Sequence, residues 1–236
     1  MDFSNLAQVE DVEAATDSIG GFSLLASGLY KMTIEMAYMG TAPKGSEILA
    51  LDLVNDSGQR YSETIYLTSG TAKGVKNTYE RGGKTHYLPG FILGKDVVEL
   101  AGKVAIDKVT LETKTIQKYN FLSKQIEPLE VETVKDIIGK QLIVGIIRFK
   151  QNKNKPDATG EYKKSNDIRE GNYIDKVFDI ATRLSTVEKA KNVTTPTFLN
   201  TWHSKWKDKI EDTYTFNPDL EKEEAAVAAA VPDPFG

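Results

Sequence analysis

The first two-thirds of the chain alternate apolar and polar residues with a period of two, which is the pattern of strands that bury one face. From Leu29 to Tyr38, large apolar residues alternate with lysine, threonine, glutamate and alanine. Similar runs cover Glu47–Val54 and Tyr61–Thr68, and the turn sequence Asn55-Asp-Ser-Gly58 separates them. The pattern therefore predicts a three-stranded meander over residues 29–68.

A helix is expected next. The apolar residues of Ile92–Ala101 fall on one helical face, and Gly102 stands where a left-handed cap would end the helix. Residues 104–134 predict an exposed, charged hairpin, with Glu127–Val134 as its less regular half. The helix would thus separate the meander from the later strands.

The most apolar strand of the chain is Gly139–Lys150. A polar loop is expected at 151–160, followed by strands at Tyr162–Lys164 and Asn172–Ile180. These segments together predict a long hairpin.

The chain then becomes helical. Ser185 precedes Glu188 by three positions, which is the spacing of a capping box. Within 197–210, Phe198, Trp202 and Trp206 form one helical stripe. We expect this stripe to pack against the sheet or against a second copy of the chain, so a homo-oligomer stays open.

The order of these elements predicts a mainly β fold with added helices. Three strands, a helix and further strands follow each other as in the OB-fold, a five-stranded barrel. The barrel would carry an inserted hairpin at 104–134 and a C-terminal helix. We divide the chain into an acidic N-terminal arm (1–24), the OB-fold domain with its C-terminal helix (25–210) and an acidic tail (211–236). Another antiparallel α+β arrangement is the main alternative.

The charge of the chain is unevenly distributed. Its formal net charge is −4, but residues 1–20 contain five acids and no base, and residues 211–236 contain seven acids and one lysine. The body between them therefore carries +7. A basic body with acidic ends suits a protein whose body attracts phosphate, although the same charge also fits a mildly basic surface.

Two stretches combine basic and aromatic residues, a composition suited to phosphates and stacked bases. The first is glycine-rich and runs from Ser69 to Tyr87, and the second lies between Arg148 and Arg169 on the predicted long hairpin. The alternative for the first stretch is an ordinary solvated surface loop. The candidate residues for binding nucleic acid are Tyr66, Lys73, Lys76, Tyr79, Arg81, Lys84, Tyr87, Arg148, Phe149, Lys150, Lys153, Lys155, Tyr162, Lys163, Lys164 and Arg169.

The sequence offers no constellation for catalysis. The chain lacks cysteine, contains two histidines far apart, and has no Gly-x-Ser-x-Gly motif. Asp52, Asp56 and Glu63 lie near one turn, where they are expected to be solvated. We therefore expect no enzyme, no metal and no cofactor. The sequence shows neither a membrane-spanning run nor a secretory signal, so we expect a cytoplasmic protein, in the host cytoplasm if it is viral.

The end of the chain adds a further signal. An acidic, alanine-rich stretch that should be mobile ends in Asp233, Pro234 and Phe235. This tail, together with Gly28-Leu-Tyr30, Ile65-Tyr-Leu-Thr-Ser-Gly70, Leu88-Pro-Gly-Phe91, and Val177-Phe-Asp179 before Ser185-Thr-Val-Glu188, resembles bacteriophage single-stranded DNA-binding proteins. The likeness covers about residues 25–190 and the tip of the tail, and it departs from the family in the alanines of the tail and in the glycine after Phe235.

The resemblance implies an OB-fold protein that coats single-stranded DNA without sequence preference in phage replication or recombination. It also implies that the tail competes with DNA and contacts replication or recombination proteins through Asp233, Pro234 and Phe235. The alternative is an OB-like protein-interaction or virion module that has no role with nucleic acid.

Overall fold

The fold is mainly β, as the sequence predicts. The structure is a computed structural model that describes residues 24–120, 123–156, 160–218 and 220. The strands in these ranges are β1 (Gly28–Thr41), β2 (Glu47–Asn55), β3 (Arg60–Tyr66), β4 (Thr78–Arg81), β5 (Lys84–Tyr87), β6 (Leu111–Asn120), β7 (Gln125–Val134), β8 (Gln141–Pro156), β9 (Tyr162–Asp179) and β10 (Ile210–Asp212). The helices are α1 (Pro89–Gly102), α2 (Thr186–Ala190) and α3 (Phe198–Trp206).

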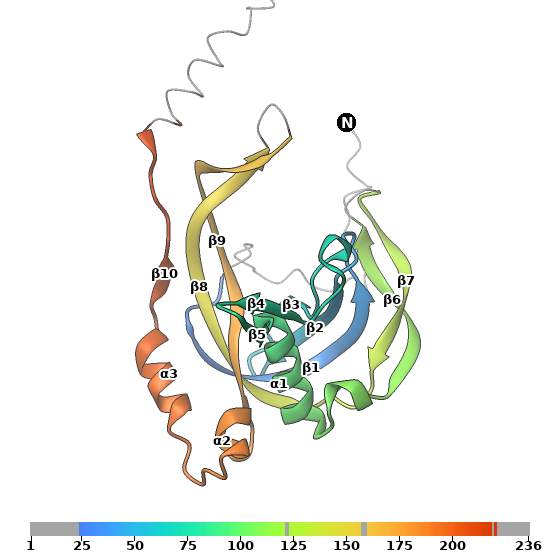
Figure 1. Cartoon of the computed structure of the whole chain (residues 1–236). Helices are drawn as coiled ribbons and strands as arrows, with labels where there is room; N and C mark the ends of the chain where they lie inside the picture. The colour runs from blue at the N-terminus through green and yellow to red at the C-terminus, as the bar shows by residue number, and fades with distance from the viewer. Residues whose placement is uncertain (1–23, 121–122, 157–159, 219, 221–236) are drawn as a thin grey trace, which may run out of the picture.

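Strand β1 lies at the centre of an open, largely antiparallel sheet (Figure 1). One of its edges pairs with β2, and the other pairs first with β8 and then with β7. Because β3 pairs with β2 and β9 with β8, the strands follow the order β9-β8-β1-β2-β3. The β6–β7 hairpin extends from β1, and β10 runs parallel to β8 just beyond the end of β1. The predicted meander, β1-β2-β3, is confirmed.

The main core lies between the inner face of this sheet and α1. Alternate side chains of the strands point to this core. In β1 this alternation is interrupted once, at an irregularity in the pairing between Ile34 and Met36. Among the fully or nearly fully buried side chains are Met32, Ile34, Leu49, Leu51, Ile65, Val97, Val98, Val134, Leu142 and Val144. No helix within the described ranges has both the length and the apolar character that a membrane span needs.

Helix α1 confirms the predicted helix, but its C-terminal cap is different. Gly102 is the last helical residue, and the left-handed conformation falls on Lys103, with φ of 57°. The Lys103 ammonium donates to the Leu100 carbonyl and forms an ion pair with buried Asp179. These contacts explain why a lysine holds a position that more often takes glycine.

The predicted polar loop at 151–160 is wrong in its first part, because β8 continues to Pro156. The two strands expected at Tyr162–Lys164 and Asn172–Ile180 are parts of the single strand β9. Asn152 explains the error. Its side chain is buried and donates to the carbonyl oxygens of Ser165 and Thr215, so a polar residue holds an inward position of the hairpin.

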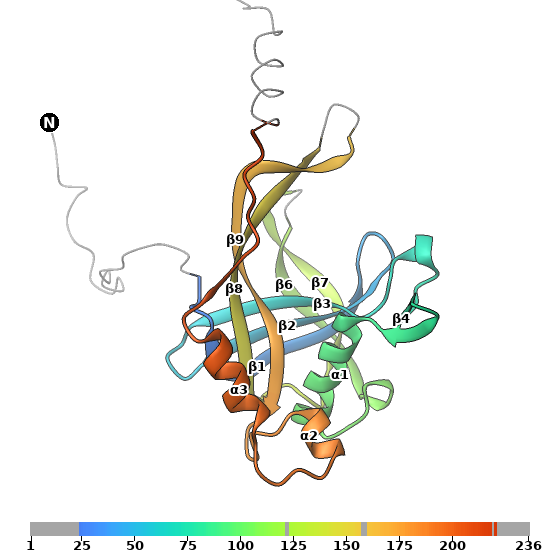
Figure 2. The same cartoon turned by 60° about the vertical axis from the view of Figure 1, so that its left-hand side comes forward.

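The C-terminal part of the fold covers the outer face of β8 and β9 (Figure 2). The capping box of Ser185 and Glu188 is present at the start of α2. The helix expected over 197–210 ends at Trp206, and β10 follows it. Trp202 is buried against Gly145, where an added Cβ would lie 2.9 Å from the indole ring, so the predicted packing of this helix on the sheet is confirmed.

The two ends of the five-strand order, β3 and β9, are joined by a side chain. No strand pairing connects them within the described residues. Instead the Glu63 carboxylate accepts the backbone N–H of Ile174 at 3.1 Å and the hydroxyl of Tyr61. Burial raises the pKa of Glu63, and the two hydrogen bonds oppose that shift only in part. A carboxyl expected to be solvated is therefore largely enclosed.

We predict opposite outcomes for two substitutions of Glu63. The folded pKa lies above the ordinary value of about 4.5, so ionising Glu63 costs stability as pH rises from that value through the folded pKa. Glu63→Gln keeps a hydrogen-bond acceptor and removes this cost. The free energy of unfolding of the variant should therefore rise relative to that of the wild type as pH increases over that range. Glu63→Ala should lose about 1–3 kcal/mol because the Ile174 N–H loses its acceptor. Urea denaturation at several pH values measures both. An equal loss in the two variants would contradict the role of this link.

Candidate nucleic-acid interface

A cleft of about 960 Å³ opens between the loop after β1, the segment after β3 and the start of α1. We call it the basic cleft because three lysines and one acid, Glu80, line it. Its lining includes Lys44, Tyr66, Lys73, Lys76, Tyr79 and Gly90. Lysines beside tyrosines are the groups that phosphates and base faces need.

Close backbone contacts hold the walls of the basic cleft in place. The Thr71 N–H donates to the Lys44 carbonyl at 3.0 Å. A Cβ added at Gly70 would lie 2.6 Å from that same oxygen, and one at Gly90 would lie 2.1 Å from the Tyr66 carbonyl oxygen. Only glycine allows these approaches, so the two loops and α1 form one preformed surface.

The start of α1 also lines the basic cleft through Leu88, Pro89 and Gly90. Leu88 provides no side-chain cap, and the first turn carries no acidic side chain. The N-terminal N–H groups of a helix carry partial positive charge. The helix start therefore adds to the positive potential of the lysines.

Beside the basic cleft, the predicted glycine-rich loop contains the β4–β5 hairpin, which the sequence prediction missed. Gly82 and Gly83 form its turn, with φ of 59° and 71°. Two glycines between two short strands are a known hairpin signal, so the sequence could have predicted this hairpin. The hairpin is what arranges the basic and aromatic residues of this stretch.

One face of the β4–β5 hairpin carries only basic and aromatic side chains. Tyr79 pairs with His86, and Arg81 pairs with Lys84, so all four lie on the same face. The rings of Tyr79 and His86 are 5.6 Å apart, and all four residues are exposed. We call these four residues the hairpin face.

The cations of the basic cleft and hairpin face have no acidic partner among the residues that the structure describes. All are exposed, and none forms an ion pair with any residue in the described ranges; they are Lys44, Lys73, Lys76, Arg81 and Lys84. Arg81 and Lys84 even stand directly opposite each other, an arrangement that destabilises a strand pair. Within the described ranges, their positive charge is therefore not neutralised by an ion pair.

Of the two tyrosines that flank this stretch, Tyr66 lies at the basic cleft and Tyr87 lies away from the hairpin face. Tyr66 is 55% exposed on the outer face of β3, at the edge of the basic cleft. Tyr87 lies on the other side of the hairpin, where its ring stacks on Phe91 with centroids 5.0 Å apart. Tyr87 is therefore not part of the hairpin face.

The second predicted stretch lies on the outer half of β8 and β9, and we call it the distal patch. It contains Arg148, Phe149, Lys150, Lys153, Lys155, Tyr162, Lys163, Lys164 and Arg169. Figures 1 and 2 both show it at the far end of the β8–β9 hairpin, well separated from the β4–β5 hairpin. The two stretches do not form one continuous surface.

Several cations of the distal patch are ion-paired. The distances are 2.6 Å for Arg148–Glu170, 3.5 Å for Lys150–Asp212 and 2.8 Å for Lys155–Asp167. Lys150 also lies over the ring of Tyr214. These contacts neutralise much of the charge that the sequence assigned to an external partner.

Phe149 serves the fold of the hairpin more than an open surface. Its ring lies on Gly171 across the strand pair, where an added Cβ would be 2.7 Å away. Arg169 covers the ring at 5.6 Å, and Tyr173 packs beside it at 6.1 Å. Tyr162, which is 70% exposed, remains the open aromatic side chain of the candidates on this patch.

Sequence reasoning missed Lys44 and His86. Lys44 lies in the loop before β2 and reaches the cleft only through the tertiary contact with Gly70, so no local signal identifies it. His86 follows from the register of the hairpin. Asp233, Pro234 and Phe235 lie outside the described residues, and within the described part no cluster of His, Asp or Glu could hold a metal ion.

Arg81 and Lys84 place two like charges at directly opposite strand positions, which leads to a stability prediction. Lys84→Thr should leave the free energy of unfolding unchanged or raise it by about 0.2–1 kcal/mol, because it removes like charges from directly opposite strand positions. Lys155→Thr is the matched control, since it removes an ion pair instead. Urea denaturation measures both, and a clear loss of stability in Lys84→Thr would show that this lysine serves the fold.

No protein-family model matches the chain, and no curated protein matches it. The function therefore has to be argued from the residues themselves.

Proposed function

We propose that this protein binds and coats single-stranded DNA without sequence preference, in phage DNA replication or recombination. One observation carries the proposal: the basic cleft and the hairpin face combine exposed aromatic rings with cations that form no ion pair among the described residues. The acidic tail would contact partner proteins.

Phosphates would bind in the basic cleft. Lys44, Lys73 and Lys76 line it together with the uncapped start of α1. A phosphate there would meet ammonium groups and helical N–H groups at once, and both favour anions. The rigid backbone contacts of Gly70 and Gly90 support a site that needs little reordering to bind.

Bases would stack on the hairpin face. Tyr79 and His86 offer ring faces, and Arg81 and Lys84 lie next to them for the flanking phosphates. Base stacking depends little on base identity, which accounts for the absence of sequence preference. Stacking also requires bases freed from a duplex, so single strands should bind more tightly.

We also propose that the open sheet is an OB-type barrel. The order β9-β8-β1-β2-β3, the position of α1 between β3 and β8, and the link from Glu63 to Ile174 support it. In OB-folds, the face of the second and third strands and the adjoining loops bind oligonucleotides. The basic cleft adjoins β2, β3 and the loop before β2, which fits that location.

The distal patch would make a weaker contribution. Its position on the long hairpin suits a second contact along a strand that has left the basic cleft. Because Arg148, Lys150 and Lys155 already have acidic partners, a phosphate must compete with those partners. The alternative, a protein-interaction or virion module, predicts that DNA binds neither at the basic cleft and hairpin face nor at the distal patch.

The first prediction from this proposal concerns salt. Log affinity for a single-stranded oligonucleotide should fall linearly with log salt, with a slope of about −0.7 per neutralised phosphate, so five contacts give roughly −3.5. Fluorescence anisotropy with single-stranded and duplex oligonucleotides measures this. A flat salt dependence, or tighter binding to the duplex, would refute the proposal.

The second concerns stacking. Tyr79→Ala should weaken binding by about 1–3 kcal/mol if a base stacks on this ring. Tyr119→Ala is the matched control, because Tyr119 is similarly exposed on the β6–β7 hairpin but lies outside the basic cleft and hairpin face. Circular dichroism confirms that both variants fold. Equal affinities for the two variants would exclude stacking at Tyr79.

The third concerns the acidic tail. Asn217 hydrogen-bonds to Asn166, so a deletion of 221–236 leaves that contact intact while removing four acids and one lysine. Tethered acids compete with DNA for nearby cations, so the deletion should tighten DNA binding, most at low salt. Phe235→Ala should leave DNA affinity nearly unchanged and weaken the binding of a replication or recombination protein. Identical DNA affinity of the full and truncated proteins at low salt would rule out the competition.

A further inference from the structure

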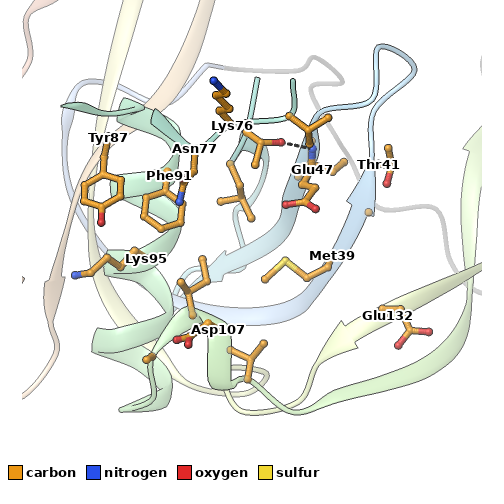
Figure 3. A pocket seen from close by; sticks show the side chains of 18 of the residues that line it. Met39, Thr41, Glu47, Lys76, Asn77, Tyr87, Phe91, Lys95, Asp107 and Glu132 are labelled. Carbon is orange, nitrogen blue, oxygen red and sulfur yellow. Dashed lines mark hydrogen bonds between the residues drawn. The ribbon is translucent and has the colours of Figure 1, made fainter. Parts of the chain in front are cut away.

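A second recess, larger than the basic cleft, lies on the other side of the β4–β5 hairpin. Its volume is about 1150 Å³, and it is bounded by α1, the ends of β1 and β2, and the segment between α1 and β6. We call it the acidic recess. Figure 3 shows Tyr87 and Phe91 on one side of it and Met39 and Glu132 on the other.

The walls of the acidic recess are largely apolar and open to solvent. The stacked rings of Tyr87 and Phe91 form one wall. Val75 and Leu111 line it with 37% and 46% of their surfaces exposed, and Met39, which is partly buried, packs against the main core. An exposed apolar surface in a recess favours the burial of an apolar side chain from outside.

The charges at its rim differ in sign from those of the basic cleft. Four carboxylates line the recess against two lysines; they are Glu47, Glu99, Asp107 and Glu132 against Lys76 and Lys95. Lys95 is paired with Glu99 at 2.8 Å, and Asp107 is paired with its neighbour Lys108 at 3.6 Å. Glu47 and Glu132 then stand against Lys76, so a net negative charge is left over. Glu132 also accepts the Thr113 hydroxyl, which holds its carboxylate in place.

We infer that the acidic recess docks a segment of a partner protein in which an apolar side chain is flanked by lysine or arginine. The apolar side chain would pack against Tyr87, Phe91 and Met39, and the cations would meet Glu47 and Glu132. Charge disfavours two other occupants: the carboxylates of the rim repel phosphates, and they also repel the acidic N-terminal arm and the acidic tail of this chain.

The acidic recess is also a neighbour of the basic cleft. The two share Thr68, Lys76 and Thr78 in their linings. A segment docked in the acidic recess would therefore lie against the root of the hairpin that carries Tyr79. The inference itself does not depend on DNA binding, because it rests on the shape and charge of the recess alone.

The test uses the full-length protein and a fluorescein-labelled peptide with phenylalanine and leucine at its centre and lysines on both sides. One comparison peptide replaces the lysines with glutamate, and another replaces the two apolar residues with alanine. Anisotropy should show that the lysine peptide binds at least about tenfold more tightly than either comparison peptide, given the rim carboxylates Glu47 and Glu132 and one buried apolar contact. Equal binding of the lysine and glutamate peptides would overturn the inference.

Substitutions locate the binding. The triple variant Glu47→Gln, Asp107→Asn and Glu132→Gln should weaken the lysine peptide by about tenfold, and Leu111→Ala should weaken it as well. The control triple variant Asp56→Asn, Glu130→Gln and Asp208→Asn removes the same charge from exposed positions outside the recess and keeps the acidic arms, so it should bind as the wild type does. Equal loss in both triple variants would mean general charge attraction and would overturn the inference. If the first triple variant sediments differently from the wild type and the control variant does not, the recess serves self-association. That result would also overturn the inference.

Discussion

Helix α1 can lie directly on the end of β3 because glycine occupies the two positions of closest approach. A Cβ at Gly90 would meet the Tyr66 carbonyl oxygen at 2.1 Å, and one at Gly94 would meet the Leu67 side chain at 2.4 Å. This contact fixes the start of α1 beside the β4–β5 hairpin. The basic cleft then lies toward Leu88 and Gly90, and the acidic recess lies toward Phe91 and Lys95. Both proposed binding surfaces depend on the same helix–strand packing.

The distribution of ion pairs separates the two basic stretches more clearly than their composition does. Lys155 on the distal patch has an acidic partner nearby in its own hairpin, and Lys150 has one supplied by β10. Arg81 and Lys84 face each other, and neither forms an ion pair with an acid in the part of the chain that the structure describes. Like charges held together on a rigid hairpin cost stability, and a bound polyanion removes that cost. This reasoning makes the β4–β5 hairpin the centre of the proposed interface.

The local patterns predicted the local elements. The period-two alternation of residues 29–68 predicted β1, β2 and β3, and the apolar helical face of Ile92–Ala101 predicted α1. The outer half of β8 was missed because Asn152 occupies an inward position whose partners, Ser165 and Thr215, are remote in sequence. The candidate site was predicted in part for the same reason: Lys73, Lys76 and Tyr79 stand out in the sequence, whereas Lys44 joins them only through tertiary contact. The pairing of Lys150 with Asp212 likewise needs the fold.

Photo-cross-linking tests the central claim most directly, because it reports which side chains touch the bases. A single-stranded oligonucleotide that carries bromouracil is bound to the full-length protein and irradiated, and the cross-linked peptides are identified by mass spectrometry. Our account predicts cross-links at Tyr79 or His86 on the β4–β5 hairpin. Cross-links confined to the distal patch, with none on the β4–β5 hairpin, would contradict it.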